Sequence, residues 1–489
     1  MNRLSGISKG LHKYIFNSAE QYALTLTIKD MPRPKTLPII GTKLDFLLAG
    51  RGTKLHDYID ARHKQLGSIF TENLGGNTDL VFISDSDLMK SLFLNLEGKY
   101  PVHILPEPWV LYEKLYDFKR GLFFMNGEEW LENRRIMNKH LLRENSDAWL
   151  ETPIKETVKN FVGKWKNRAA GASCVISNLD LELYKLSTDV IIKVLLGADS
   201  KLSESRQYED LISIFSQEVK KIFQTTTKLY GLPLNLCQRL NLKVWTDFKE
   251  SVDSSIFLAQ KIVNEILLNK NKTNGLIKKL SDDNVSDEII KKIAVDFVIA
   301  AGDTTSYSTF WSLLMLSENN ETIKDVREQG SSFVKHVVKE TMRLYPVAPF
   351  LTRILPQECL LGPYKINKGT PIIASIYTSG RDEHNFSNAH MFLPYRWDRN
   401  DPRKASLKNH VPSATLPFAL GARTCIGKRI AMMQLTEIIE QIVNNFNFKI
   451  QGGENVKPIT CQVLVPDRHP MFANSLILII KICINRNHT

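Results

Sequence analysis

The sequence predicts a mainly α-helical protein with a small β region. Residues 153–306 carry helical patterning almost throughout, with a break at the Gly-Leu-Pro run that starts at Gly231. Residues 293–316 are strongly apolar over a length typical of a long buried helix. Two β-prone runs, 69–74 and 80–83, flank Gly-Gly-Asn, which favours a hairpin turn. The helical region therefore forms the body, and the hairpin starts a small sheet at its edge.

Shorter elements follow local patterns. Residues 31–38 hold three prolines, which disfavour a helix and predict a stiff extended lead-in. Residues 55–66 have the periodicity of an amphipathic helix, with Leu55, Tyr58 and Ile59 on one side. Residues 475–480 are apolar but too short to span a bilayer, and they predict a buried strand.

The composition restricts the class of protein. The 489 residues carry 64 Lys and Arg against 52 Asp and Glu, a formal charge of +12, which suits an anionic membrane, an acidic protein or nucleic acid as partner. No basic run is interleaved with aromatic residues, which makes nucleic acid the weakest of these. The six cysteines are scattered without a CxxC pair or zinc spacing, so free thiols in a reducing compartment are expected.

The first 30 residues have the pattern of a mitochondrial transit peptide. All charged side chains before the first acidic residue, Glu20, are basic, and apolar residues recur every three to four positions. An ordinary surface helix has the same periodicity. No run of about 20 apolar residues, the length that spans a bilayer, is found. We expect residues 1–30 to be a removable transit peptide and residues 31–489 to form the folded domain.

The clearest functional motif is the run FALGARTCIG at residues 418–427. It places Cys425 between two glycines, which let a backbone approach a bulky group where a Cβ would collide. Arg423 offers a guanidinium that can bind a carboxylate through two hydrogen bonds. A buried free thiol is the ordinary alternative for a single cysteine. The full run disfavours that alternative, because Phe418, Arg423 and both glycines stand at offsets from Cys425 that match the signature of a known family.

These offsets resemble the cysteine loop of the cytochrome P450 family. The resemblance covers nearly the whole chain and implies one large, mainly helical domain with the cytochrome P450 fold, in place of the two or three domains that the length alone suggests. It also implies haem b as the cofactor, with the Cys425 thiolate as axial iron ligand. Such a ligand pushes electron density to the iron and favours O–O cleavage.

The resemblance further implies haem-binding side chains. Trp130 and Arg134 are four residues apart, hence on one helical face, and match the family's propionate-binding pair. Taken alone, they would more often form a surface cation–π pair. His103 stands where many relatives have a propionate arginine, which leaves that contact open. The other positions that match the family's cofactor-binding residues are Arg353, Phe418 and Arg423.

Residues 300–305, AAGDTT, interrupt the long apolar run. Read alone, they are a helix stop followed by an N-cap. By the resemblance they are the centre of the helix that crosses the haem, where small residues leave room for oxygen and the Thr304 hydroxyl bonds back to an upstream carbonyl. Asp303 and Thr304 are then the catalytic residues that deliver protons. The family's usual glycine falls at Ala301, directly before Gly302.

Glu340 and Arg343 form the family's ExxR pair. Alone, they would be a helix-surface ion pair worth ~0.3–0.5 kcal/mol. The resemblance implies that they are buried together with Arg396. Removing one partner of a buried ion pair costs ~3–5 kcal/mol. Tyr395 stands where relatives often have Glu, which leaves part of this network open.

The resemblance implies a haem-thiolate monooxygenase of the mitochondrial class, peripheral on the matrix side of the inner membrane. Residues 229–236 are either an apolar membrane contact or a plain buried loop. Electrons are expected from a 2Fe–2S ferredoxin with ferredoxin reductase. The basic residues expected to dock the ferredoxin are Lys335, Lys339, Lys428 and Arg429.

Within this class the chain closely resembles the insect ecdysteroid 2-hydroxylases. The resemblance implies O2-dependent hydroxylation at C2 of a 2-deoxyecdysteroid, most simply 2-deoxyecdysone to ecdysone in ecdysteroid biosynthesis. The alternatives are another ecdysteroid position such as C22, a xenobiotic substrate, a haem-thiolate isomerase that needs no electrons, and a non-catalytic haem sensor. The intact Asp303–Thr304 pair argues against the isomerase.

Overall fold

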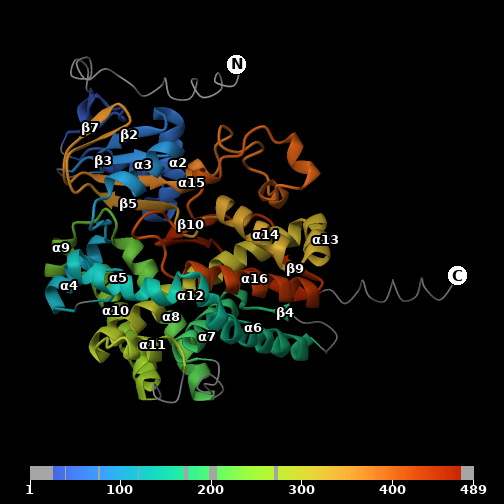
Figure 1. The fold of residues 1–489 in the computed structure, drawn as a ribbon. Helices are drawn as coiled ribbons and strands as arrows, with labels where there is room; N and C mark the ends of the chain where they lie inside the picture. The colour runs from blue at the N-terminus through green and yellow to red at the C-terminus, as the bar shows by residue number, and fades with distance from the viewer. Residues whose placement is uncertain are drawn as a thin grey trace, which may run out of the picture.

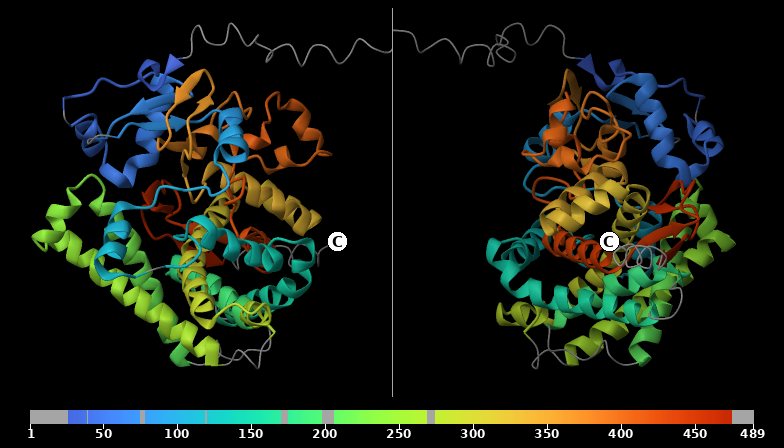
Figure 2. Two further views of the ribbon diagram at one scale, coloured as in Figure 1. Left: turned by 60° about the vertical axis from the view of Figure 1, so that its left-hand side comes forward. Right: turned by 90° about the vertical axis from the view of Figure 1, so that its right-hand side faces the viewer.

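The helical body and the β-rich part are distinct in the computed structural model, which describes residues 26–38, 40–74, 78–118, 120–169, 175–197, 206–268 and 274–474. In Figure 1 most strands lie at the top and most helices lie below them. Figure 2 shows the same division from two other sides. The prediction of a mainly α protein with a small β region is confirmed.

The elements have the following bounds. The helices are α1 (Lys43–Leu48), α2 (Leu55–Leu66), α3 (Ser86–Ser91), α4 (Glu107–Tyr116), α5 (Gly127–Leu141), α6 (Asp147–Ala169), α7 (Leu179–Leu196), α8 (Arg206–Leu229), α9 (Leu234–Arg239), α10 (Lys243–Leu268), α11 (Leu276–Asp282), α12 (Asp287–Glu318), α13 (Asn320–Gln329), α14 (Ser331–Leu344), α15 (Ile376–Ser379) and α16 (Lys428–Asn445). The strands are β1 (Leu26–Thr27), β2 (Ile69–Glu72), β3 (Leu80–Ile83), β4 (Val175–Ile176), β5 (Phe350–Ile354), β6 (Cys359–Leu361), β7 (Tyr364–Ile366), β8 (Pro371–Ser375), β9 (Phe448–Gln451), β10 (Pro458–Cys461), β11 (Val463–Pro466) and β12 (Met471–Asn474).

The strands form small sheets. In Figure 1, α2, α3 and α15 lie together with most strands at the top, and β4, β9 and β10 lie beside the helices below. The described residues give the strand orders β2-β3-β8-β5, β1-β7-β6, β4-β12-β9 and β10-β11. The predicted hairpin is confirmed, because β2 and β3 pair antiparallel with Ile69 opposite Ile83; its turn, 75–77, lies outside the described residues. The predicted helix at 55–66 is confirmed as α2. The strand expected at 475–480 also lies outside the described residues.

The N-terminal boundary of the folded part lies before residue 31. Leu26 pairs with Tyr364 of β7 in a parallel register, so residues 26–30 of the expected transit segment are part of the fold. Residues 1–25 lie outside the described residues. A mature chain that keeps strand β1 therefore begins ahead of Leu26.

Helix α12 runs through the core of the helical body. It is continuous from Asp287 to Glu318, so reading residues 300–305 as a helix stop is wrong. The Ser286 hydroxyl caps its start by accepting a hydrogen bond from the Ile289 N–H. A helix that is apolar on nearly every side must be buried, and α12 packs against α7, α10, α14 and α16. This burial fixes the position of its small central residues.

Glu340 of α14 lies at the centre of a buried ion-pair network, as predicted. Its carboxylate accepts hydrogen bonds from Arg343 at 2.8 and 2.9 Å and from Arg396 at 2.9 Å, and all three side chains have zero exposure. The Trp397 indole also donates to Glu340, at 2.9 Å. Tyr395 lies under the Arg403 guanidinium, 4.7 Å from it, and takes no acidic role in the network.

Candidate active site

The Cys425 loop is a tight turn that leads into helix α16. The Cys425 N–H donates to the Phe418 carbonyl at 2.8 Å, and the Thr424 hydroxyl donates to the same oxygen at 3.0 Å. Ala419 and Gly421 have left-handed backbone angles, with φ of 57° and 76°. These bonds place the thiol just ahead of the α16 N-terminus, where the helix dipole favours a thiolate.

The Cys425 thiol is accessible and yet surrounded by protein. Its side chain is exposed. Even so, burial is the largest influence on the pKa of the thiol and raises it, while the Gly427 N–H and the charges of Arg134 and Lys428 lower the pKa by less. A side chain that is accessible and still enclosed by protein lines a cavity. Gly427 needs no positive φ, because its φ is −85°. An added Cβ at Gly427 would lie 4.0 Å from the sulfur, an ordinary contact distance, so the described protein atoms do not require a glycine here.

Two of the predicted haem-binding arginines come from other elements, and one of them, Arg134, bonds this loop directly. Arg134 of α5 donates to the Thr424 carbonyl at 2.5 Å. Arg353 of β5 donates through Nε to the Glu97 carboxylate at 2.6 Å. Both arginines are buried. The structure thus brings α5, β5 and the Cys425 loop to one place.

Arg423 is oriented by backbone oxygens and by an aromatic ring. It donates to the carbonyls of Pro101 and Met125 at 2.5 and 2.6 Å. Its guanidinium lies 4.4 Å from the centroid of the Trp130 ring. The cation over Trp130 is therefore Arg423, and the alternative of a surface cation–π pair between Trp130 and Arg134 is wrong, since both of these side chains are buried.

The buried cations exceed the buried anions here. Glu97 is the one carboxylate in the described part of the chain whose charge acts on all three guanidiniums. Burial, followed by the charges of Arg353 and Arg134, lowers the pKa of Arg423 to about 10, and burial likewise lowers that of Arg134 to about 10. Within the described residues, Arg134 Nε and Arg353 Nη2 are buried without a hydrogen-bond acceptor. Two propionate carboxylates of a haem fit this excess.

His103 lies beside the same cations. Burial, and then the charges of Arg423 and Arg353, lower the pKa of His103 to about 3, so its ring is neutral at physiological pH. Its buried Nε2 has no partner among the residues that the structure describes. His103 can therefore offer a neutral N–H, not a charge, to a carboxylate at this place.

One face of α12 is open at its centre. Ala300 is exposed and Thr304 is half-exposed in a helix that is otherwise buried on both sides of them. The Thr304 hydroxyl donates to the Ala300 carbonyl at 3.0 Å, which confirms the predicted bond to an upstream carbonyl. Both residues can therefore border a hollow within the helical body.

The opposite face of α12 carries Gly302 and Asp303. An added Cβ at Gly302 would lie 2.5 Å from the Tyr184 ring of α7, so this glycine makes room for Tyr184 and not for oxygen, contrary to expectation. Asp303 is 1 % exposed, and neither carboxylate oxygen has a partner within the described residues. Burial raises the pKa of Asp303 to about 7, so this acid carries a proton over part of the physiological range.

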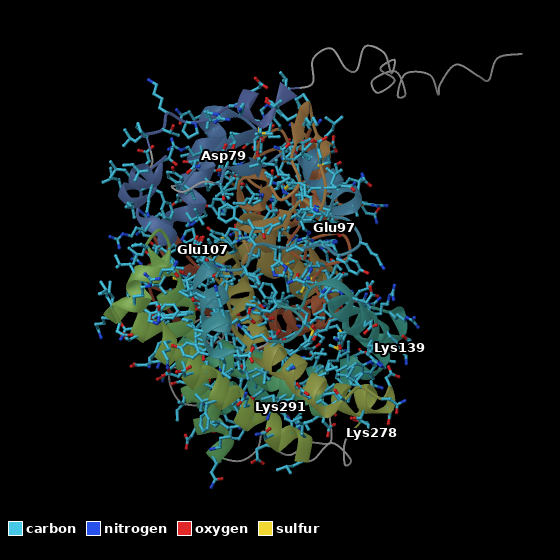
Figure 3. The ribbon with its side chains drawn as sticks, turned by 90° about the vertical axis from the view of Figure 1, so that its left-hand side faces the viewer. Asp79, Glu97, Glu107, Lys139, Lys278 and Lys291 are labelled. Carbon is cyan, nitrogen blue, oxygen red and sulfur yellow. The ribbon has the colours of Figure 1, made fainter. Side chains whose placement is uncertain are left out.

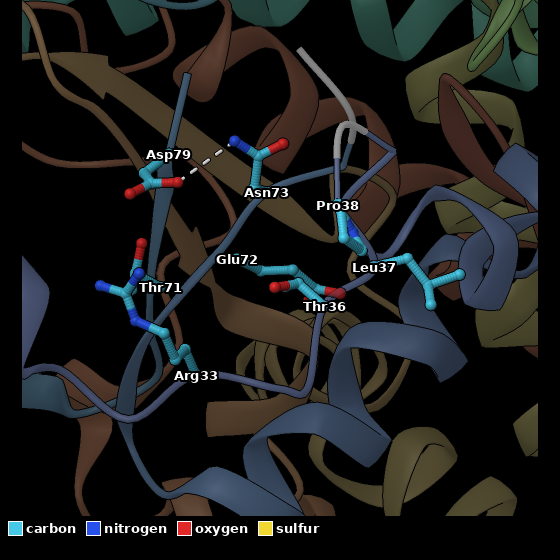
Figure 4. Close-up of a pocket in the computed structure, with 9 residues that line it drawn as sticks. Arg33, Thr36, Leu37, Pro38, Thr71, Glu72, Asn73 and Asp79 are labelled. Carbon is cyan, nitrogen blue, oxygen red and sulfur yellow. Dashed lines mark hydrogen bonds between the residues drawn. The ribbon is translucent and has the colours of Figure 1, made fainter. Parts of the chain in front are cut away.

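A separate polar pocket of about 280 Å³ lies at the N-terminal edge of the β-rich part (Figure 4). It includes no predicted site residue. Its walls hold carboxylates, an amide and a guanidinium, which do not suit a large apolar ligand. It is lined by Arg33, Thr36, Leu37, Pro38, Gly41, Thr71, Glu72, Asn73 and Asp79.

Sequence reasoning missed Glu97 and Tyr184. Glu97 directly follows the apolar run LFLNL, and a charge at the end of such a run is a usable signal of a buried acid. Tyr184 lies in the ordinary amphipathic pattern of α7 and gives no such signal. Its role appears only when α7 meets Gly302.

The family and its relatives agree with this geometry. The sequence profile of the cytochrome P450 family matches residues 31–473. The chain is 37% identical over 459 residues to cytochrome P450 315a1, mitochondrial, of Drosophila melanogaster, covering 90% of this chain and 87% of the relative. It is 28% identical to the mitochondrial 1,25-dihydroxyvitamin D(3) 24-hydroxylase of Rattus norvegicus, covering 91% and 88%. It is 26% identical to the mitochondrial cholesterol side-chain cleavage enzyme of Hypanus americanus, covering 82% and 81%.

The family match spans most of the chain, and the first of these relatives exceeds 30% identity over nine tenths of it. Members of this family hold haem through a cysteine thiolate and insert an oxygen atom from O2. The chain belongs to the cytochrome P450 family and is a haem-thiolate monooxygenase with mitochondrial relatives.

Proposed function

We propose that this enzyme hydroxylates C2 of a 2-deoxyecdysteroid, converting 2-deoxyecdysone to ecdysone in the mitochondrion. The similarity to insect ecdysteroid 2-hydroxylases supports this choice, and two of its relatives are named for other sterol-derived substrates. The observation that carries the reaction class is the pairing of an enclosed, accessible Cys425 with the open face of α12. Burial of the rigid apolar rings would supply most of the affinity, at ~25 cal/mol per Å².

The residues take the following roles in this proposal. Cys425 ligates the iron, and Arg134, Arg353 and Arg423 bind the propionates, with Trp130 and Phe418 against the cofactor. When bound, the haem supplies the oxygen activation and C–H chemistry. Thr304 orients a proton donor on the open face of α12, and Asp303 holds the proton behind it.

Product identification tests the substrate. The purified enzyme is incubated with 2-deoxyecdysone, ferredoxin, ferredoxin reductase and NADPH, and the product is identified by mass spectrometry and NMR. Ecdysone is expected, formed in step with NADPH consumption. Hydroxylation at C22, or no turnover of ecdysteroids, would contradict the C2 proposal. Haem binding without reductant-dependent product would favour the haem sensor.

Replacing Thr304 with Ala should uncouple the enzyme. The helix keeps its backbone bonds, so haem and substrate binding should persist, while the ordered hydroxyl that positions a proton donor is lost. Hydrogen peroxide released per NADPH should rise and product per NADPH should fall, roughly 10-fold or more, in line with the usual contribution of general acid catalysis. Thr309→Ala, on the buried side of α12, is the control. Unchanged coupling in Thr304→Ala would remove Thr304 from the mechanism.

We propose that three of the four basic residues expected to dock the ferredoxin form its docking surface. Lys335, Lys339 and Lys428 are all exposed. Burial, and then the charges of Lys335 and Lys428, lower the pKa of Lys339, so the three ammonium groups form one positive patch. Arg429 does not belong to this patch, because it donates to the Leu142 carbonyl at 3.1 Å and to Asp147 at 2.7 Å.

Replacing Lys339 with Glu should raise the ferredoxin concentration needed for half-maximal turnover by about 10-fold at low salt, since opposite charge speeds docking of an acidic partner. The difference from wild type should shrink as salt screens the charges. Lys90→Glu, an exposed position on α3 in the β-rich part, should leave that concentration unchanged. Equal ferredoxin dependence of Lys339→Glu and wild type across the salt series would refute the docking site.

An apolar surface supports peripheral membrane contact. The tip expected at 229–236 is only partly exposed, with Leu229 buried. Helix α1 packs against this tip and enlarges the apolar surface, because an added Cβ at Gly231 in the tip would lie 3.5 Å from the ring of Phe46 in α1. Among the described helices, none is both long and apolar enough to cross a bilayer. The exposed apolar side chains here are Leu44, Leu48, Leu236, Leu240 and Leu242.

A further inference from the structure

Glu97 is a buried carboxylate between the two parts of the molecule. Figure 3 labels it where the β-rich part meets the helices below. It directly follows a π-helical turn, Leu92–Leu96, and only 5 % of the residue is exposed. Such turns are rare and occur mostly at functional sites. A buried acid without partners would be costly, so its contacts should show what it serves.

One carboxylate oxygen of Glu97 holds the Cys425 loop. Its Oε1 accepts a hydrogen bond from the Ala422 N–H at 2.7 Å, three residues before Cys425. Gly421 is required for this approach, because an added Cβ would lie 2.3 Å from the same oxygen and 2.1 Å from the Phe93 carbonyl. The loop and Glu97 therefore fit only with a glycine between them.

The other carboxylate oxygen holds a haem-facing arginine. Its Oε2 accepts from Arg353 Nε at 2.6 Å. This bond fixes the guanidinium plane, which also lies 4.7 Å from the Phe93 ring. Arg353 Nη2 is buried and has no acceptor in the part of the chain that the structure describes. Since Nε is held by Glu97 and Nη1 donates to the Thr352 carbonyl at 2.8 Å, Nη2 is the nitrogen that remains for a carboxylate.

We propose that Glu97 is a positioning residue that joins the propionate-binding arginines to the thiolate loop and holds the reduction potential of the haem at a more negative value. One rigid side chain fixes Ala422 and Arg353 at the same time, so the loop and the propionate site keep one relative position. Its negative charge offsets one of the three guanidiniums here, those of the buried Arg134 and Arg353 and of the partly buried Arg423.

The charge argument gives the direction of the effect. Reduction of the ferric haem adds one electron, and a nearby positive charge favours the reduced state. Removal of the Glu97 charge leaves three guanidiniums without this counter-charge in a buried site. The reduction potential should therefore become more positive, and Arg353, no longer fixed, should hold the propionate less well.

The test compares Glu97→Gln with Glu128→Gln. Glu128 is an exposed acid on nearby α5, paired with Tyr100 and Lys99, so its replacement removes the same charge where water screens it. The readouts are the haem reduction potential, from spectroelectrochemical titration, and the rate of haem transfer to apomyoglobin. We expect a positive shift and several-fold faster haem loss in Glu97→Gln, with neither change in Glu128→Gln. Wild-type values in Glu97→Gln, or equal shifts in both variants, would overturn the proposal.

Glu97→Asp separates charge from position and covers the case in which Glu97→Gln does not fold. It keeps the charge but withdraws the carboxylate by one methylene. Its reduction potential should stay close to wild type while its haem loss is faster. Haem loss at the wild-type rate would overturn the positioning role. None of these readouts depends on the steroid, so failure of the C2 proposal leaves this test intact.

Discussion

Replacing Glu340 with Gln should leave little folded, haem-containing enzyme. Glu340 is the one carboxylate seen between the buried Arg343 and Arg396 guanidiniums in the described residues, and a neutral amide presents an N–H₂ donor where both need an acceptor. Removal of one partner from a buried ion pair costs ~3–5 kcal/mol. Domains have about 5–15 kcal/mol of stability in total. We expect a loss of this size in denaturant unfolding and a large fall in haem content after expression.

Exposed Glu328 on α13 offers the matched control, because Glu328→Gln removes the same charge in water. Its effect should stay within about 0.5 kcal/mol, as for most surface substitutions. If Glu340→Gln unfolded at the same denaturant concentration as Glu328→Gln, the buried network would not be what stabilises this part of the fold.

The same network predicts acid lability. Burial alone raises the pKa of Glu340, but hydrogen bonds and charge from Arg343, with the charge of Arg396, outweigh it and hold the pKa below its usual 4.5. A carboxyl with a lowered folded pKa stabilises the protein at pH above its unfolded pKa, and this contribution is lost as the pH falls through the folded pKa. Wild type should therefore lose stability below about pH 4.5. The Gln variant should lack this component.

Replacing Cys425 with Ser should abolish monooxygenase activity. A serine hydroxyl has a far higher pKa than a thiol and donates less electron density to iron. The ligand that favours O–O cleavage is therefore lost. The arginines that fit the propionates are unchanged, and some haem should still bind. The red-shifted Soret band of the ferrous carbon monoxide complex, which reports thiolate ligation, should disappear.

The control is Cys359→Ser, a half-buried free cysteine on β6 in the β-rich part. This variant should keep both the band and the activity. Retention of the band by Cys425→Ser would mean that another thiol ligates the iron.

Local patterns in the sequence were enough for most of the fold. The helix period predicted α2, and alternation around Gly-Gly-Asn predicted the β2–β3 hairpin. The AAGDTT run was ambiguous on its own, since it contains both a stop signal and a cap signal. Burial of α12 along most of its length decided it, because a break there would leave backbone groups unpaired inside the core.

The site was predictable where a short motif carries it and not where distant segments meet. Cys425, Arg423 and Thr304 stand in motifs. Glu97 does not, because its partners Arg353 and Ala422 lie 256 and 325 residues away in the chain. Arg429 was assigned to the docking surface from its charge alone, and its hydrogen bond to Asp147 became visible only with α6 in place.

The contact between Gly302 and Tyr184 bears on how this enzyme can change its substrate. Because the Tyr184 ring fills the space of a Cβ at 302, α12 is pressed against α7 with no slack. A new side chain at Ala300, on the open face, alters the hollow while the helix stays where it is. A new side chain at 302 instead collides with the buried Tyr184 ring, so the ring or α12, and with it Thr304, must shift. We therefore expect substitutions that change specificity to be tolerated on the open side of α12 and not on the side that packs against α7.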